Sequence, residues 1–242
     1  MALVRFHHIH KRFGPLEVLR GISVDILEGQ RTAILGPNGS GKTTLIKTLL
    51  GMVIPDRGDV LFKGQSVIGK YLYRQEMVYM PQIAIFPHNL TVKELIALVP
   101  RLRRQPAHPD PLIERFEVHH FLEKRMNELS GGMKQKVNLV LAFMFDVPLL
   151  ILDEPTNGLD PIATIELKKL MEEETSQGKT IIFSSHLMEF VQHMAQRIVF
   201  LLEGHIYFEG TIDALLHSTE TASVEAAVAQ LMKQSHVQTE PA

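Results

Sequence analysis

The chain of 242 residues contains no cysteine and no tryptophan. Without cysteine it can form no disulfide and no thiolate zinc site, and it has no thiol chemistry, which fits a reducing compartment. An excess of positive charge is also missing, because 25 basic residues stand against 27 acidic residues and give a formal net charge of −2. Proteins that bind nucleic acid through broad phosphate contacts are usually basic, so we expect no nucleic-acid partner.

Long hydrophobic runs are missing too. The longest apolar stretch, from Leu139 to Leu152, is interrupted by Asp146 and Pro148, whereas a membrane-spanning helix needs about 20 predominantly apolar residues. We therefore expect any role at a membrane to come through a partner protein. Internal repeats are absent as well, which excludes solenoid and propeller architectures.

The composition that remains is ordinary for a folded protein, because 45% of the residues are hydrophobic and 21% are charged. Short apolar segments alternate with segments of helical periodicity, which predicts a parallel sheet covered by helices on both faces. Strands are expected at 31–35, 149–152, 180–184 and 197–202, and helices at 43–50, 112–125, 133–145, 162–176 and 187–195. The basic segment Pro100–Pro111 predicts a solvated loop, and Val224, Val228 and Leu231 predict a helix in the polar tail.

A glycine-rich segment carries the first clear chemistry. Gly36-Pro-Asn-Gly-Ser-Gly41-Lys42-Thr43 matches G-x-x-x-x-G-K-[ST] between a predicted strand and a predicted helix. Glycines let backbone N–H groups turn toward phosphate, and the helix N-terminus adds partial positive charge. Lys42 can reach the β- and γ-phosphates, and the Thr43 hydroxyl can bind Mg²⁺. The segment therefore predicts a nucleoside triphosphate site.

Two acids follow a hydrophobic strand. Leu149–Leu152 runs directly into Asp153 and Glu154, and desolvating paired acids is costly unless they meet a cation. Asp153 is predicted to bind Mg²⁺ through water, and Glu154 to orient or deprotonate the water that attacks the γ-phosphate. Two solvated acids in a turn would be the simpler interpretation if the phosphate loop were absent.

The segment Leu129-Ser130-Gly131-Gly132-Met133-Lys134-Gln135 resembles the signature motif of the nucleotide-binding subunits of ATP-binding cassette (ABC) transporters. It precedes Asp153-Glu154 at the spacing which that family shows. Further motifs follow in the family's order, so that the resemblance covers roughly residues 2–216. Phe13 corresponds to the aromatic residue that stacks on adenine, Gln82 to the Q-loop glutamine, Asp160 to the D-loop aspartate and His186 to the switch histidine.

The resemblance implies a set of site residues. Glu154 and His186 are expected to be catalytic, with His186 holding the γ-phosphate, Glu154 and water in line. ATP is expected to contact Phe13, Gly36, Pro37, Asn38, Gly39, Ser40, Gly41, Lys42, Thr43, Thr44, Gln82, Ser130, Gly131, Gly132, Gln135 and Asp160. The expected Mg²⁺ site consists of Thr43, Gln82 and Asp153.

A second anion site is visible in the signature segment itself. Ser130, followed by two glycines and a predicted helix, forms a helix N-terminus that suits an anion. One chain needs only one phosphate site for one nucleotide. The resemblance implies that the two sites meet across a head-to-tail homodimer, with each ATP held between Gly36–Thr43 of one copy and Ser130–Gly132 of the other.

The resemblance also implies the architecture and the setting. The expected fold is α/β, a P-loop NTPase (RecA-like) parallel sheet core with an antiparallel β subdomain and an α-helical subdomain. Residues 2–217 would form the nucleotide-binding domain, with the helical subdomain at about 90–147, and residues 218–242 a partly helical tail. Such a subunit hydrolyses ATP at the cytoplasmic face of the inner (cell) membrane, docked on an integral membrane transporter subunit.

Finer matches and two other interpretations remain. The signature segment looks most like the mainly exporting ABC-2 group, and Met80–Ile96 is similar to the ATPase of the transporter that matures copper-containing nitrous oxide reductase. An ABC ATPase acting on ribosomes or DNA is the main alternative, although the chain has one domain and no basic excess. A kinase-like P-loop enzyme would leave Leu129–Gln135 and His186 unexplained.

Overall fold

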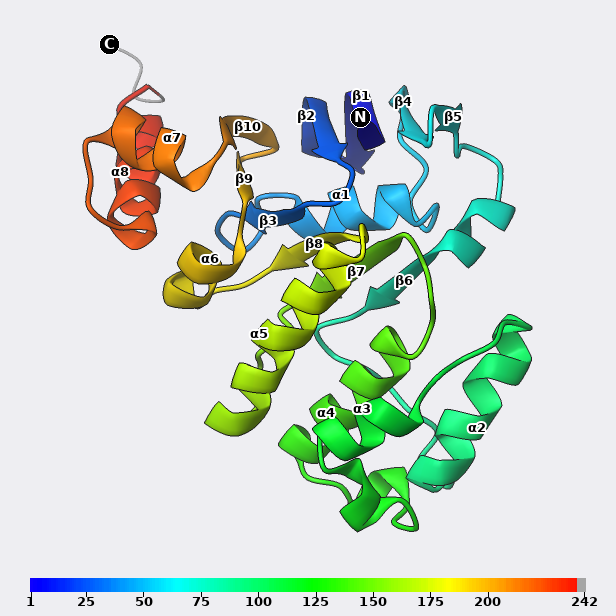
Figure 1. Ribbon diagram of the computed structural model, residues 1–242. Helices are drawn as coiled ribbons and strands as arrows, with labels where there is room; N and C mark the ends of the chain where they lie inside the picture. The colour runs from blue at the N-terminus through cyan, green and yellow to red at the C-terminus, as the bar shows by residue number, and fades with distance from the viewer. Residues whose placement is uncertain (239–242) are drawn as a thin grey trace. The chain divides into compact units, whose positions relative to one another are not determined.

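The computed structural model describes residues 1–238, with side chains as far as Lys233, and it divides into two compact units. The first unit comprises residues 1–74 and the chain from Ile182 onward, and the second comprises Gln75–Ile181. The strand β8 (Thr180–Ser184), yellow in Figure 1, begins in the second unit and ends in the first. The last four residues of the tail expected at 218–242 lie outside the described residues.

The first unit begins with an antiparallel sheet of order β2-β1-β4-β5. β1 (Ala2–Phe13) pairs with both β2 (Leu16–Leu27) and β4 (Arg57–Phe62), and β4 pairs with β5 (Gln65–Ser66). On β1, Val4 and Phe6 are buried whereas Arg5 between them is exposed, which is the period-two pattern of a strand with one buried face. This sheet confirms the expected antiparallel β region.

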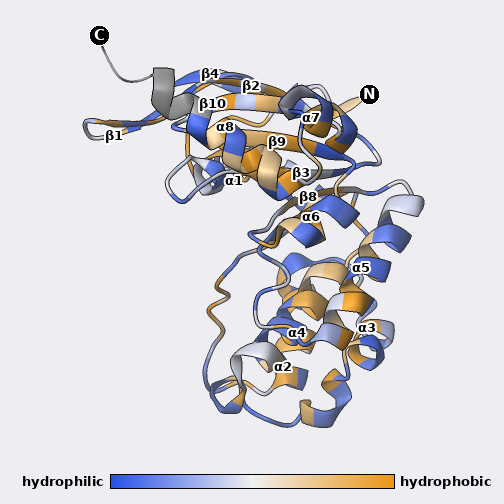
Figure 2. Ribbon diagram, turned by 90° about the vertical axis from the view of Figure 1, so that its left-hand side faces the viewer, coloured by the Kyte–Doolittle hydropathy of each residue, from blue (hydrophilic) through white to orange (hydrophobic). Residues whose placement is uncertain are grey.

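Parallel strands of the first unit position the glycine-rich segment. β3 (Arg31–Leu35) pairs in parallel with β9 (Arg197–Leu202), which pairs in turn with the antiparallel β10 (His205–Gly210). Residues 198–202 of β9 are buried, and Figure 2 shows most of this strand in the orange of hydrophobic residues. β3 leads through the glycine-rich segment into α1 (Lys42–Leu49), and α6 (Met188–Met194) follows β8.

The C-terminal part of the described chain forms two helices that lie side by side, α7 (Ile212–Thr219) and α8 (Val224–Gln238) (Figures 1 and 2). The apolar stripe expected in the tail lies on α8, where Val224 and Leu231 are buried and Val228 is half-buried. The backbone N–H of Val224 donates to Oε1 of Gln192 on α6 at 3.3 Å. The stripe therefore packs within the first unit.

The second unit combines two parallel strands with helices. β6 (Met77–Met80) follows the short 3₁₀ helix η1 (Leu72–Glu76) and pairs with β7 (Leu149–Asp153). The α-helices are α2 (Val92–Arg103), α3 (Asp110–Arg115), α4 (Gly131–Phe143) and α5 (Pro161–Ser176), with 3₁₀ turns η2 (Val118–Phe121) and η3 (Met126–Glu128). The helix expected at 112–125 is confirmed only over 112–115, because α3 ends at Arg115 and the left-handed φ of 56° at Glu117 separates it from η2.

The basic segment Pro100–Pro111 is also less solvated than expected, and its first four residues belong to α2. α2 continues through Pro100, and the guanidinium of Arg103 lies 4.4 Å from the centroid of the Phe145 ring. Arg103 also donates to Gln75 O at 3.0 Å and to Met77 O at 3.1 Å, and burial lowers its pKa. The expectation of a solvated loop is therefore wrong for Arg103, because its partners lie far away in the sequence.

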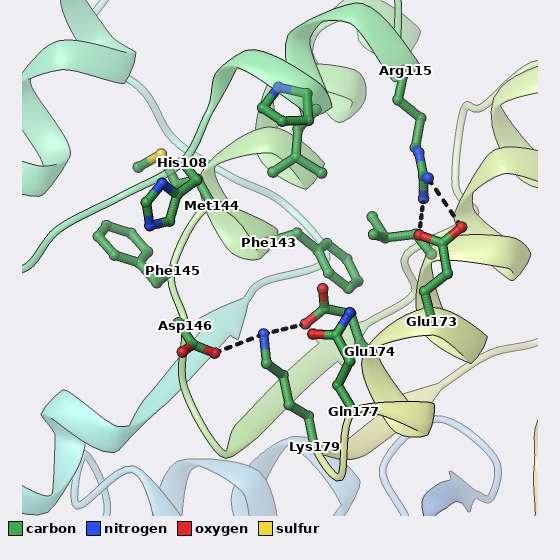
Figure 3. A pocket seen from close by; sticks show the side chains of 13 residues that line it. His108, Arg115, Phe143, Met144, Phe145, Asp146, Glu173, Glu174, Gln177 and Lys179 are labelled. Carbon is green, nitrogen blue, oxygen red and sulfur yellow. Dashed lines mark hydrogen bonds and ion pairs between the residues drawn. The ribbon is translucent and has the colours of Figure 1, made fainter.

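A pocket of about 390 Å³ opens among α3, α4 and α5. Figure 3 shows that Lys179 lies between Asp146 and Glu174, and that Arg115 pairs with Glu173. Lys179 Nζ is 3.0 Å from Asp146 Oδ1 and 2.6 Å from Glu174 Oε2. Burial alone would lower the pKa of Lys179, but the hydrogen bonds to Glu174 and Asp146 outweigh it and raise this pKa. The cations of the pocket are thus paired with carboxylates of the same unit, which is the arrangement of a structural ion-pair cluster.

Candidate nucleotide site

The loop between β3 and α1 has the backbone that a phosphate site needs. Gly36 has a φ of 148° and Gly41 a φ of 107°. A Cβ on Gly36 would collide with Leu201 O, and one on Gly41 would lie 2.9 Å from Cδ2 of Leu19. Only glycine fits both positions. The two glycines therefore shape the loop in two ways, through their φ angles and through close packing against neighbouring strands.

Polar groups inside this loop are suited to bind an anion. Lys42 Nζ donates to Gly36 O at 2.6 Å and to Pro37 O at 3.0 Å, which places the ammonium inside the loop. The Ser40 hydroxyl is buried and has no hydrogen-bond partner among the described residues. A buried donor without a partner, beside an ammonium at a helix N-terminus, is the environment that a phosphate group satisfies.

Most of the other expected residues of the first unit lie at exposed positions. Asn38, Gly39 and Thr43 are exposed around the loop, and Thr44 is half-buried. Phe13 lies at the end of β1 with 50% of its surface exposed, and Lys11 Nζ is 5.4 Å from its ring centroid. His186 is exposed and follows β8 by two residues.

Asp153 occupies the carboxyl end of β7 in the second unit, where it is 8% exposed. The hydroxyl of Tyr79, from β6, donates to Asp153 Oδ2 at 3.4 Å. Burial, followed by the charge of Asp153 and this hydrogen bond, raises the pKa of Tyr79 to about 12. A carboxylate oxygen of this kind is a suitable ligand for Mg²⁺, directly or through water.

Glu154 has an unusual backbone for its residue type. It is 2% exposed and has a φ of 52°, which is disfavoured for residues other than glycine. Asn157 N donates to Glu154 O at 3.1 Å, so the strand turns sharply directly after Asp153. Strained backbone that the surroundings maintain is typical of functional sites.

The signature segment forms the N-terminus of α4. Ser130 is the N-cap, and its hydroxyl accepts from Met133 N at 3.3 Å. Gly131 is exposed, and Gly132 is half-buried at the first turn. This is the capped, glycine-lined helix start expected from the sequence, and its amide groups suit an anion.

The environments of Gln82, Asp160 and Gln135, the remaining expected residues, range from exposed to buried. Gln82 is exposed directly after Pro81 at the end of β6. Asp160 caps α5 by accepting from Ala163 N at 2.8 Å, and this bond and the Lys136 ammonium lower its pKa. Gln135 differs from the expectation of a nucleotide contact, because its side chain is buried and donates to the backbone of its own chain.

Sequence reasoning missed Tyr79 and Lys136. Tyr79 reaches Asp153 because β6 and β7 pair in parallel, with Tyr79 opposite Ile151. Lys136 Nζ lies 2.9 Å from Asp160 Oδ2. No strand was expected before Gln82, and only the pairing of β6 with β7 in the structure shows that Tyr79 reaches Asp153.

The comparisons with known proteins identify one family. The ABC transporter family profile matches residues 19–157. The chain is 35% identical over 224 residues to a Nod factor export ATP-binding protein I of Burkholderia lata, covering 90% of this chain and 74% of that protein. It is 30% identical over 211 residues to the lantibiotic transport ATP-binding protein SrtF of Streptococcus pyogenes, covering 87% of this chain and 92% of that one.

A solved structure of an ATP-binding subunit of an ABC transporter has the same fold. It superposes with a TM-score of 0.86 at 29% sequence identity, covering 95% of this chain and 99% of the other. The expected P-loop NTPase fold, with parallel strands, an antiparallel sheet and helices, is thereby confirmed. None of the helices within the described residues is both long enough and apolar enough to cross a membrane. The chain belongs to the ABC transporter family, as an ATP-binding and ATP-hydrolysing member of it.

Proposed function

We propose that this chain is the ATPase subunit of an exporter of the ABC-2 type, and that two copies work as a head-to-tail dimer on an integral membrane subunit. The observation that carries the proposal is the loop at Gly36–Thr43, which holds an ammonium and a buried hydroxyl directly before and at the start of α1. The exporter assignment is supported by the relatives, because the chain spans most of a Nod factor export protein and of a lantibiotic transport protein.

The residues divide the reaction between them. Phe13 stacks on the adenine, and the backbone of the loop together with Lys42 holds the phosphates. Glu154 accepts a proton from the attacking water, and His186 orients the γ-phosphate. Thr43, Gln82 and Asp153 would hold Mg²⁺, which would supply neutralisation of the charge that develops on the phosphate oxygens.

The head-to-tail dimer is supported by the duplicated anion sites. The second unit presents the capped N-terminus of α4 at Ser130–Gly132, in addition to the phosphate loop of the first unit. A nucleotide held between the loop of one copy and the α4 N-terminus of the other uses both sites. ATP binding then closes the dimer, and hydrolysis opens it, at the cytoplasmic face of the cell membrane.

The domain assignment belongs to the same proposal. Residues 2–217 form the nucleotide-binding domain, with a helical subdomain at about 90–147 that includes α2, α3 and α4. Residues 218–242 form the tail. ABC ATPases that act on ribosomes or DNA are not favoured, because the relatives that the chain resembles carry transport names.

We propose that the segment directly after Gln82 binds the membrane subunit, and substitutions in this segment test that contact. Ile83 and Ile85 are 77% and 88% exposed there, and burying one isoleucine side chain stabilises by about 1.5–3 kcal/mol. We expect the double variant Ile83→Ser/Ile85→Ser to weaken co-purification with the membrane subunit at least about tenfold. ATP binding by the purified chain should not change.

The control for this experiment is Ile165→Ser. Ile165 is 52% exposed on α5, so the variant loses a similar side chain from another surface and should co-purify normally. Retention of the membrane subunit by the double variant would refute docking at this segment. Recovery of the wild-type chain with ribosomes or DNA, and with no membrane protein, would refute the transport proposal itself.

A narrower proposal concerns the cargo, namely that the transporter serves copper and sulfur processing in the maturation of nitrous oxide reductase. Its support is the similarity of the segment Met80–Ile96 to the ATPase of that system. In cells that lack this chain, the copper content of purified nitrous oxide reductase should fall several-fold and should recover on complementation. A fully copper-loaded enzyme in those cells would exclude this cargo.

A further inference from the structure

Gln135 holds the backbone that carries Glu154. Its carboxamide is buried, and Nε2 donates to Pro155 O at 3.0 Å and to Glu154 O at 3.4 Å. The left-handed φ of 52° at Glu154 persists only where surrounding contacts maintain it. These two hydrogen bonds, made by a neutral donor that is itself removed from water, are contacts of that kind.

Two more contacts join α4 to the same loop within the second unit. A Cβ on Gly132 would lie 2.6 Å from Gly158 O, so the two backbones pack directly against each other. Lys136 Nζ lies 2.9 Å from Asp160 Oδ2 and 3.6 Å from Glu117 Oε2, and its side chain is only 14% exposed. The first two turns of α4 thus contact the loop between β7 and α5 near its start, its middle and its end.

We infer that Gln135 is a positioning residue for Glu154, and that α4 links the signature segment to the catalytic carboxylate of the same chain. The inference rests on the proposed function, in which Ser130–Gly132 contacts the nucleotide of the partner copy while Glu154 acts on the nucleotide of its own copy. A shift of the α4 N-terminus when the nucleotide of the partner copy binds therefore changes the position of the Glu154 carboxylate at the nucleotide of its own copy. The two ATP sites of the dimer are coupled through Gln135.

The residue type at position 135 follows from the chemistry of the contact. Both acceptors are backbone carbonyls, so the side chain must donate, and a neutral amide does so without placing a buried charge beside Glu154. Methionine has a similar shape and no N–H group, so Gln135→Met removes the donor with little change in packing. Histidine places an N–H group at a similar reach, so Gln135→His serves as the conservative variant.

The experiment uses the full chain and measures MgATP affinity, turnover and dimer formation. For Gln135→Met we expect kcat to fall about 10- to 100-fold while the Kd for MgATP stays within about twofold. An ATP-bound dimer should accumulate on size-exclusion chromatography, because binding is intact and hydrolysis is slow. Gln135→His should recover at least about a third of the wild-type kcat.

Gln105→Met is the matched control. The Gln105 carboxamide also donates to a backbone carbonyl, Gln75 O at 2.9 Å, and its Oε1 accepts from Arg103 Nε at 2.8 Å; among the described residues, both of these partners lie outside the loop after β7. This variant should keep kcat within about twofold. Lys136→Met tests the same link without touching Gln135, and it should lower kcat about three- to tenfold, with recovery in Lys136→Arg.

The outcomes separate this inference from the proposed function. If the wild-type chain does not hydrolyse ATP, the proposed function fails. If the wild type is active and Gln135→Met keeps the wild-type kcat, the positioning role is overturned. It is also overturned if the loss of kcat only matches the loss of folded protein and no ATP-bound dimer accumulates. If Gln135→Met does not fold, Lys136→Met decides, and an unchanged kcat in that variant overturns the link.

Discussion

Glu154→Gln is expected to lower ATP turnover by about 10²- to 10⁴-fold, which is the usual contribution of a general base. The carboxylate is 2% exposed and lies on a left-handed turn that Gln135 and Asn157 hold in place. A glutamine side chain has the same shape as glutamate, and the substitution leaves the backbone hydrogen bonds of Gln135 and Asn157 to residue 154 in place. The neutral amide, however, cannot accept the proton of the attacking water. Nucleotide binding, which depends on the loop at Gly36–Thr43, should remain.

The second part of this prediction is the oligomeric state. A variant that binds ATP and does not cleave it should accumulate as a dimer with MgATP, measured by size-exclusion chromatography with light scattering. Glu172→Gln makes the same chemical change at an exposed position on α5 and should behave as the wild type. Normal turnover by Glu154→Gln would remove Glu154 from its assigned role. A strictly monomeric variant at saturating MgATP would contradict the dimer proposal.

The strand, glycine loop and helix at 31–50 could be predicted from the sequence because each step is local. Glycines at Gly36 and Gly41 supply the φ angles, and the apolar pattern of the neighbouring segments sets the strand and the helix. The N-cap role of Ser130 was equally local, because a capping side chain bonds to an amide three residues ahead.

Contacts between distant segments could not be predicted in this way. Gln135 follows the signature glycines, so its place in the motif suggested a nucleotide contact, yet its acceptors lie 19 and 20 residues further on. Arg103 was expected in a solvated loop, yet its ring partner is Phe145. The assignment of such polar side chains depends on which segments pack together, and periodicity within one segment carries no information about that.

Lys42→Ala is expected to weaken ATP binding itself, by about 10- to 150-fold, since a hydrogen bond to a charged group stabilises by about 1.5–3 kcal/mol. Lys42 Nζ lies inside the loop, at 2.6 Å from Gly36 O and 3.0 Å from Pro37 O. The ammonium thus stands where the β- and γ-phosphates are proposed to lie. Its loss removes a positive charge from the loop and a donor from two of its carbonyls.

Lys47→Ala separates these local effects from a general change in charge. Lys47 is exposed in the last turn of the same helix, so the variant loses the same side chain without touching the loop. Its Kd for ATP, measured by calorimetry or by fluorescent nucleotide titration, should stay within about twofold of the wild-type value. Equal affinity of Lys42→Ala and the wild type would refute the phosphate contact. A loss of affinity in both lysine variants alike would assign the effect to net charge, because the two side chains share only their charge and their helix.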